Sequence, residues 1–495
     1  MTNRHKLANS SRNTSANKGF CFGLQPAPAW TAILGLVFFT IAGTFAGGGS
    51  ILRLVFPIAS FAVGLLLYLR YPALYVGFTW WMWMLTAFVR RIIDYRTGWD
   101  RQGLILLAPY LVTFITIATF VRYLPKSYRM GGLPFIMAAV AVFYALLIGV
   151  VRFQPILVIR NGLEWIGPIL FGFHLFVNWQ EYPNYRQTIQ RTFLWGVLVT
   201  GAYGVVQFLL APPWDCLWLV ESGMTSSAGS PEPLKMRVWS TMHAPGLFAS
   251  FLMGALLLLF TSKEPLSLPS NLVGYLAFLL SLVRTCWGGW LVGLMTLLTS
   301  VKAKLQMRLT VTILVMVLCV FPLATMEPFS KMLNQRFQTF TNIEQDSSFR
   351  ARSTIYDEHL NIALSQGLGN GIGNAFILNK QGKLEVFSLD SGVLDIFFTL
   401  GWFGAIFYLT GLAMLLFSVF QYTESRFDSF MSAARAVAVS ICATLPLNSA
   451  MLGISGLMLW GFLGLCMAGH KYHQHQHALL ATQQSANYPS KQAST

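Results

Sequence analysis

Four arginines lie outside the apolar runs of this chain or at their ends, where they could act together. Arg237 precedes a predicted helix that starts near His243, Arg284 lies between two apolar runs, and Arg350 and Arg352 open a long polar stretch. A guanidinium is a planar fork that binds phosphate oxygens two at a time, so several together could hold a diphosphate. Each arginine could instead extend from a helix end to the lipid head groups. Arg284 fits that alternative least, because apolar sequence flanks it on both sides.

The candidate base lies in the stretch from Asp346 to Gly404, the longest interruption of the apolar sequence. Asp390 and Ser391 immediately precede the apolar segment that begins at Val393. An aspartate at this place could be the N-cap of a helix. It could also be a general base at the membrane surface, with a pKa raised by partial desolvation. The reserve candidates for the base are His243 and His359.

The segment GLGNGIGNAF has a glycine at every second position over its first half. Glycine permits a tightly curved backbone and the close approach of a ligand, so this segment could contact substrate. A turn that packs under the long loop is an equal alternative. The spacing is not that of a dinucleotide-binding fingerprint. The candidate substrate-binding residues are Arg350, Gly369, Gly371, Gly373 and Ser391.

The composition places these residues in a membrane protein. Of the 495 residues, 55% are hydrophobic and only 11% are charged, and the mean hydropathy is +0.57. A soluble core of this size could not bury so much apolar side chain. Because about 20 apolar residues span a bilayer as a helix, the apolar runs predict an all-α polytopic bundle of about 12–14 transmembrane helices with one long extracytoplasmic loop.

The net charge of +16 comes from basic residues scattered between the apolar runs. This pattern indicates membrane topology and contact with anionic lipid, and it does not indicate a nucleic-acid partner. The six cysteines form no CxxC motif and no paired spacing, so neither a metal site nor a disulfide framework is predicted. No cofactor is indicated.

Counting basic residues in the connections places both ends of the chain in the cytoplasm. Two short apolar runs, Leu272–Val283 and Trp287–Leu298, could be one bent helix, which would reverse the side of everything that follows. One connection breaks the charge rule, because its four arginines would lie outside the cell. These are Arg90, Arg91, Arg96 and Arg101.

The end of the chain from His470 is rich in histidine, glutamine and serine, which is typical of a disordered tail. Its histidines could hold a metal, but a solvated tail is favoured. The predicted order is a basic cytoplasmic tail (1–28), N-terminal transmembrane helices (29–211), an extracytoplasmic loop (212–242), transmembrane helices (243–326), the long extracytoplasmic loop with the site residues (327–392), C-terminal transmembrane helices (393–469) and a disordered cytoplasmic tail (470–495).

The order of the motifs resembles the O-antigen ligase and polymerase superfamily over roughly the C-terminal half of the chain. The motifs are an arginine before a helix with proline and Phe-Ala (Arg237–Ser250), Ser-x-x-Arg at a helix end (Ser281–Arg284), an arginine followed by an aromatic residue and alternating glycines (Arg352–Gly373), and a polar pair followed by two glycines (Asp390–Gly404).

The resemblance implies a metal-independent glycosyltransferase of surface-polysaccharide assembly in the inner membrane. Its donor would be a polyprenyl-diphosphate-linked glycan, and its acceptor a hydroxyl of a glycan or lipid. Arg237, Arg284 and Arg352 would hold the donor diphosphate, with Asp390 as the catalytic base. Ligases of the family usually have His-Asn where this chain has Asp390-Ser391.

That departure favours polymerisation of the glycan over ligation of a finished glycan to a lipid or protein. Two further alternatives come from other classes of protein. One is a polytopic transporter, in which Arg284 and Asp395 would line the path. The other is a non-catalytic scaffold.

Overall fold

The computed structural model describes residues 26–299, 367–374, 376–378, 384–386 and 389–487, with a few scattered positions between 306 and 365. The predicted site residues Arg350, Arg352 and His359 lie outside the described residues. Most of the predicted span over residues 309–326 does so too.

Ten helices within the described ranges are long and apolar enough to cross a membrane, which confirms the predicted all-α polytopic fold. Several begin with proline in the first turn, where its missing N–H costs no hydrogen bond. The spans are α1 (Ala27–Phe45), α2 (Gly49–Arg70), α3 (Pro72–Thr97), η1 with α4 and α5 (Leu104–Ser127), α6 (Leu133–Arg152), α7 (Pro155–Val177), η2 with α8 (Trp179–Leu210), α17 (Gly392–Gln421), α18 with η5 (Ser429–Leu447) and α19 (Gly453–Asn487).

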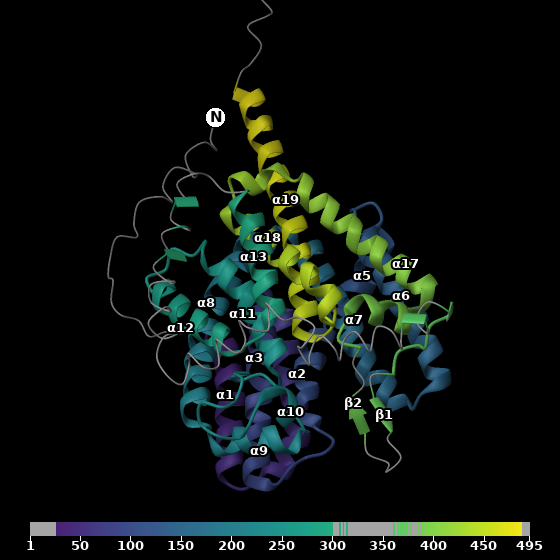
Figure 1. The fold of residues 1–495 in the computed structure, drawn as a ribbon. Helices are drawn as coiled ribbons and strands as arrows, with labels where there is room; N and C mark the ends of the chain where they lie inside the picture. Colours follow the sequence, from purple (N-terminus) through teal and green to yellow (C-terminus); the bar gives the residue numbers. More distant parts are fainter. Residues whose placement is uncertain are drawn as a thin grey trace, which may run out of the picture.

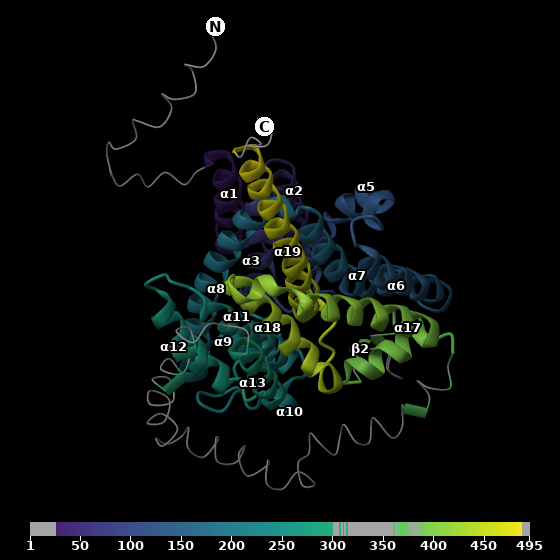
Figure 2. The same cartoon turned by 90° about the horizontal axis from the view of Figure 1, so that it is seen from above.

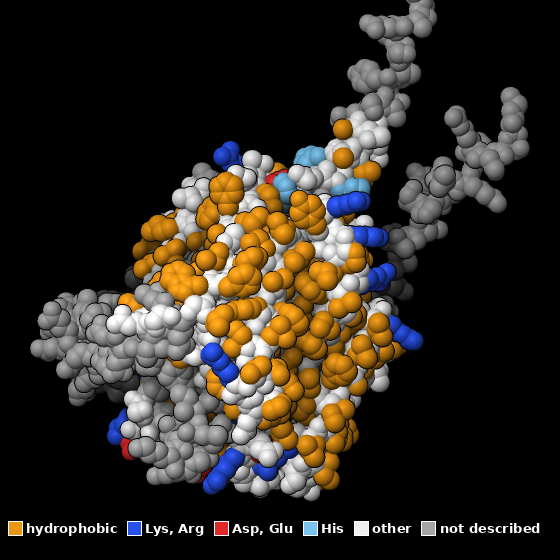
Figure 3. Space-filling model, turned by 90° about the vertical axis from the view of Figure 1, so that its right-hand side faces the viewer, with side chains coloured by type: hydrophobic (Ala, Val, Ile, Leu, Met, Phe, Trp, Pro, Cys, Tyr) orange, Lys and Arg blue, Asp and Glu red, His pale blue; other side chains and the backbone are white. Residues whose placement is uncertain are grey.

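Large hydrophobic side chains face outward along these helices. Phe38 of α1 is 74% exposed and Val151 of α6 is 86% exposed. Figure 3 shows hydrophobic side chains over most of one face, with lysine and arginine mainly towards its margins. An apolar surface of this extent requires lipid around it. The chain is therefore a multi-pass membrane protein.

Short elements gather at one end of the bundle. Helices α9 (Pro213–Glu221) and α10 (Thr225–Ala228) and the antiparallel strands β1 (Phe376–Leu378) and β2 (Leu384–Val386) lie there, opposite the C-terminal end of α19 (Figures 1 and 2). The two strands were not predicted. We call this end of the molecule the α9 end.

Helices α11 (Pro245–Leu259), α12 (Ser267–Leu280) and α13 (Arg284–Leu298) are shorter. Glycines ten residues before and nine residues after Arg284 pack at the same level of α11. Gly274 abuts Leu256, and Gly293 abuts Leu257. The chain therefore reverses at Arg284, and α12 and α13 form a helical hairpin. The alternative of one bent helix is excluded.

Helix α19 continues through residues 470–487, where the sequence predicted a disordered tail. Its histidines pair with the connection between α17 and α18. His470 Nδ1 lies 2.9 Å from Glu424 Oε1, and His473 Nε2 lies 3.0 Å from Asp428 Oδ2. These long-range partners stabilise a segment whose composition alone favours disorder.

Candidate functional site

Arg237 is in direct contact with the turn that carries Arg284. Its guanidinium donates from Nε to the Ser281 carbonyl and from Nη2 to the Leu282 carbonyl, both at 3.1 Å. A third bond, from Nη1, reaches the Ser227 carbonyl at 2.9 Å. Leu282 has a φ of 54°, which is uncommon for a residue other than glycine and requires support from its surroundings.

Three of the five N–H groups of Arg237 are thus committed to backbone carbonyls. This geometry gives Arg237 a positioning role for the turn, while its contact with a diphosphate stays a prediction. Arg284 follows as the first residue of α13, and its side chain is half-buried. Of the two, Arg284 is the candidate for direct contact with an anionic substrate.

Asp390 and Ser391, the polar pair before α17, have different roles in the structure. Ser391 is fully buried and is the N-cap of the helix, since its hydroxyl accepts a hydrogen bond from the Leu394 N–H at 3.4 Å. Asp390 is therefore not the cap. It is exposed, with a φ of 49°, and its carboxylate is accessible for a proton transfer. One turn further, Asp395 accepts a hydrogen bond from the Ser449 hydroxyl.

A series of contacts links the chain at Asp390–Gly392, which we call the Asp390 corner, to the first turn of α13. The Gly392 N–H donates to the Asn448 carbonyl at 3.2 Å. The Asn448 side-chain amide donates to Ser250 Oγ at 3.5 Å, and Ser250 Oγ lies 3.5 Å from Cys286 Sγ, two residues after Arg284. These contacts connect a residue next to the candidate base Asp390 with a residue next to Arg284, the candidate contact for the diphosphate.

The alternating glycines pack against helices of the protein. Gly369, Gly371 and Gly373 all have positive φ values, and a Cβ at Gly369 or Gly371 would lie within 2.6 Å of a backbone nitrogen of α17 or α6. The N–H groups of residues 370–373 donate to Phe398, Thr399 and Ala145 carbonyls and to Asn161 Oδ1. Because all four are used internally, the turn joins α6, α7 and α17 and does not form a phosphate cradle.

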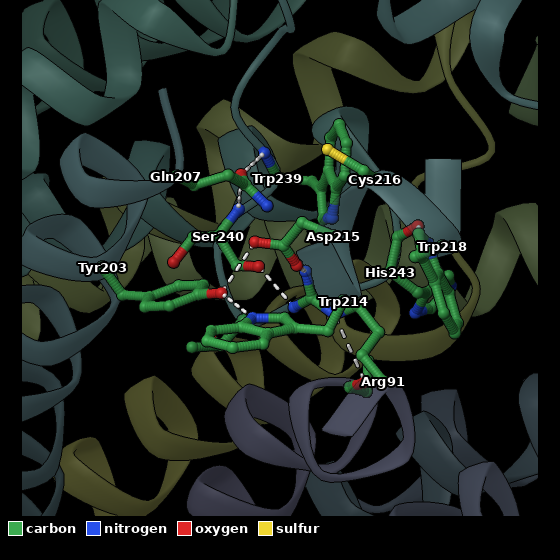
Figure 4. Close-up of polar contacts among 12 residues, drawn as sticks. Arg91, Tyr203, Gln207, Trp214, Asp215, Cys216, Trp218, Trp239, Ser240 and His243 are labelled. Atoms are coloured by element: carbon green, nitrogen blue, oxygen red, sulfur yellow. Dashed lines mark hydrogen bonds and ion pairs between the residues drawn. The ribbon is translucent and has the colours of Figure 1, made fainter. Parts of the chain in front are cut away.

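A second polar cluster, which the sequence did not identify as a site, lies where α3 meets α9. Arg91 pairs with Asp215, which also accepts a hydrogen bond from the Tyr203 hydroxyl at 2.7 Å (Figure 4). Arg90 pairs with Asp94 at 3.1 Å, and its guanidinium lies over the Trp218 ring, 5.0 Å from the centroid.

His243 faces this cluster from the start of α11. Burial and the positive charges of Arg90, Arg160 and Arg91 lower the pKa of His243 to about 4. The imidazole is therefore neutral at pH 7. An anion that entered this region would meet arginines from α3 and α7 together.

One sequence signal pointed to this second cluster. Arg90 and Arg91 belong to the connection that broke the charge rule, and the structure accounts for these two of its four arginines. Asp94 and Asp215 neutralise them at the α9 end, so they do not act as topological charges. The partner of Arg91 could not be read from the sequence, because Asp215 lies 124 residues away.

Comparison with known proteins bears on the same region. Residues 270–409 match the family model described as O-antigen ligase. The matched segment contains the α12–α13 hairpin, the glycine turn and the Asp390 corner, but neither Arg237 nor His243. Among curated proteins, no significant match is found.

Over these 140 of its 495 residues, the chain is similar to the O-antigen ligase family, whose members are glycosyltransferase-like enzymes. The match supports an O-antigen ligase-like function in general.

Proposed function

We propose that the protein transfers or polymerises a polyprenyl-diphosphate-linked oligosaccharide at the outer face of the inner membrane. The observation that carries the proposal is the contact between Arg237 and the Arg284 turn, within and beside the segment that matches the family. Arg237 supports the backbone of the turn that carries Arg284, and in the proposed function a lipid-linked diphosphate approaches Arg284 from the bilayer surface.

The reaction needs little from the protein beyond charge and placement. The acceptor hydroxyl attacks the anomeric carbon of the donor and gives its proton to the Asp390 carboxylate. The bond from that carbon to the diphosphate oxygen breaks, and the electron pair leaves with the polyprenyl diphosphate. Arg284 neutralises the charge that develops on this leaving group. Arg352, which lies outside the described residues, remains a further predicted contact with the diphosphate.

A deletion strain complemented with variants tests the proposal. Arg284→Ala and Asp390→Ala should abolish formation of the glycan product, whereas Lys235→Ala, which removes an exposed cation beside Arg237, should leave it intact. Loss of a polymerase leaves single repeat units on the carrier, and loss of a ligase leaves finished polymer on the carrier. Normal glycan in the Arg284→Ala and Asp390→Ala strains would contradict a transferase.

A further inference from the structure

Asp390 is the one exposed residue between Leu389 and Gly392, where the chain enters α17. Leu389, which precedes it, and Ser391 and Gly392, which follow it, are all buried. The φ of 49° at Asp390 is uncommon for a residue other than glycine and is maintained by contacts on both sides. This part of the chain thus presents a single carboxylate, and its neighbours decide where that carboxylate lies.

Packing fixes the chain after Asp390. Ser391 caps α17 through its hydroxyl, and the Gly392 N–H donates to the Asn448 carbonyl at 3.2 Å. A Cβ at Gly392 would lie only 2.9 Å from the same carbonyl oxygen. The start of α17 therefore lies directly against the connection between η5 (Leu445–Leu447) and α19.

Asp395 holds the chain before Asp390. It lies in the first turn of α17, and its carboxylate accepts a hydrogen bond from the Leu389 N–H. The side chains of a helix lean towards its N-terminus, so a residue in the first turn can reach backbone groups that precede the cap. One side chain thus ties the residue before Asp390 to the helix that follows it.

Ser449 holds the Asp395 side chain in this orientation. Its hydroxyl donates to Asp395 Oδ2, and both residues are half-buried. Ser449 directly follows Asn448, whose carbonyl accepts from the Gly392 N–H, so two adjacent residues of one connection support both sides of the Asp390 corner. Because Asp395 is engaged twice and Asp390 is exposed, Asp390 is the carboxylate that an acceptor hydroxyl can reach.

We propose that Asp395 is a positioning residue for Asp390, and that Ser449 fixes Asp395 in the orientation that this role requires. The inference rests on the proposed function, in which Asp390 takes the proton of the acceptor hydroxyl. A base acts only from within hydrogen-bond reach of that proton, so displacement of the Asp390 corner would slow the transfer. The donor is contacted at Arg284 in that function, so its binding would be unchanged.

Glycan formation by the purified full-length protein in detergent tests the proposal. The substrate is a total lipid extract of the deletion strain, which contains the accumulated lipid-linked glycan. Asp395→Asn keeps an oxygen that can accept from the Leu389 N–H, whereas Asp395→Leu has a similar size and no acceptor. Ser449→Ala removes the donor to Asp395. Its matched control is Ser418→Ala, which removes a hydroxyl that donates within α17, to the Met414 carbonyl. Thermal unfolding verifies that each variant folds.

Asp395→Leu should lower the maximal rate about tenfold or more and leave the half-saturating extract concentration unchanged. Asp395→Asn should retain about one third of the wild-type rate or more, and this rescue separates a hydrogen-bonding role from a need for the charge. Ser449→Ala should lower the rate about threefold, and Ser418→Ala should not change it. If Asp395→Leu does not fold, the comparison of Ser449→Ala with Ser418→Ala decides.

A folded Asp395→Leu variant with the wild-type rate would overturn the inference. An Asp395→Asn variant as inactive as Asp390→Ala would also overturn it, because the Asp395 charge would then be required. Equal rates in Ser449→Ala and Ser418→Ala would overturn the role of Ser449. None of these results bears on the transfer reaction itself. The proposed function fails instead if the Asp390→Ala and Arg284→Ala variants still form the glycan product.

Discussion

Arg91 and Asp215 form an ion pair between the end of α3 and the start of α9, and both side chains are fully buried. The pair holds the connection between α8 and α11 against the bundle. That connection has its own small apolar core, which includes Trp218 and Trp239. Because Arg237 belongs to the same connection, the pair also supports the contact that positions the Arg284 turn.

Replacing one member of this pair should strongly destabilise the protein. Asp215→Asn leaves the buried Arg91 charge without its counterion, and we expect a loss of about 3–5 kcal/mol in the free energy of unfolding. The control is Glu232→Gln, which removes an exposed ion pair with Lys235 and should cost less than about 1 kcal/mol. Thermal unfolding in detergent measures both changes, and equal effects would contradict the role assigned to the buried pair.

Arg237 and Arg284 should act as one unit in catalysis. Arg284→Ala should lower kcat by about 100-fold or more, as loss of a charge-stabilising donor does. Arg237→Lys should lower kcat by about tenfold, because an ammonium lacks the fork that spans two carbonyls. In the double variant the losses should not add, since Arg237 acts through the turn. Additive losses would instead indicate an independent contact of Arg237 with substrate.

The glycine turn should tolerate a side chain at one position and reject it at another. Gly371 has a φ of 84°, and a Cβ there would lie 2.6 Å from the Gly149 nitrogen. Gly371→Ala should therefore destabilise the protein by about 2 kcal/mol or more. At Gly367 nothing lies within 4 Å of the added atom, so Gly367→Ala should change stability by less than about 0.5 kcal/mol. A stable Gly371→Ala variant with lost activity would favour the substrate-contact alternative.

The pH dependence of the free energy of unfolding should reflect the protonation of His243. Its pKa of about 4 in the folded protein lies below the usual value of 6.5, so the unfolded chain takes up a proton that the native protein does not. The resulting stability is fully present above pH 6.5 and falls as the pH drops towards 4. At pH 5 the loss relative to pH 7 should be about 1–2 kcal/mol.

His243→Gln should remove this contribution and reduce the slope of the curve between pH 7 and pH 5. His477→Gln, which alters an exposed histidine of α19, is the control and should leave the slope unchanged. Unfolding midpoints at the two pH values measure the difference. Parallel curves for the wild-type protein and His243→Gln would show that this histidine does not titrate as described.

Some features of the candidate site could not be predicted from the local sequence. The spacing of Ser281 and Arg284 identified a helix end, but only packing on α11 shows that the chain reverses there. Asp390 was the candidate for the N-cap by residue type. The cap falls to Ser391 because the helix begins one residue later than an Asp390 cap would require.

The membrane-embedded, all-helical class was determined by the sequence alone, because about 20 apolar residues in a row have one favourable environment, and hydropathy is a property of each segment by itself. The tertiary structure decided which charges meet. Arg91 pairs with Asp215, and Arg237 donates hydrogen bonds to the carbonyls just before Arg284. The N–H groups of the glycine turn donate hydrogen bonds to three helices. These contacts join residues far apart in the chain, and their geometry depends on how the helices pack.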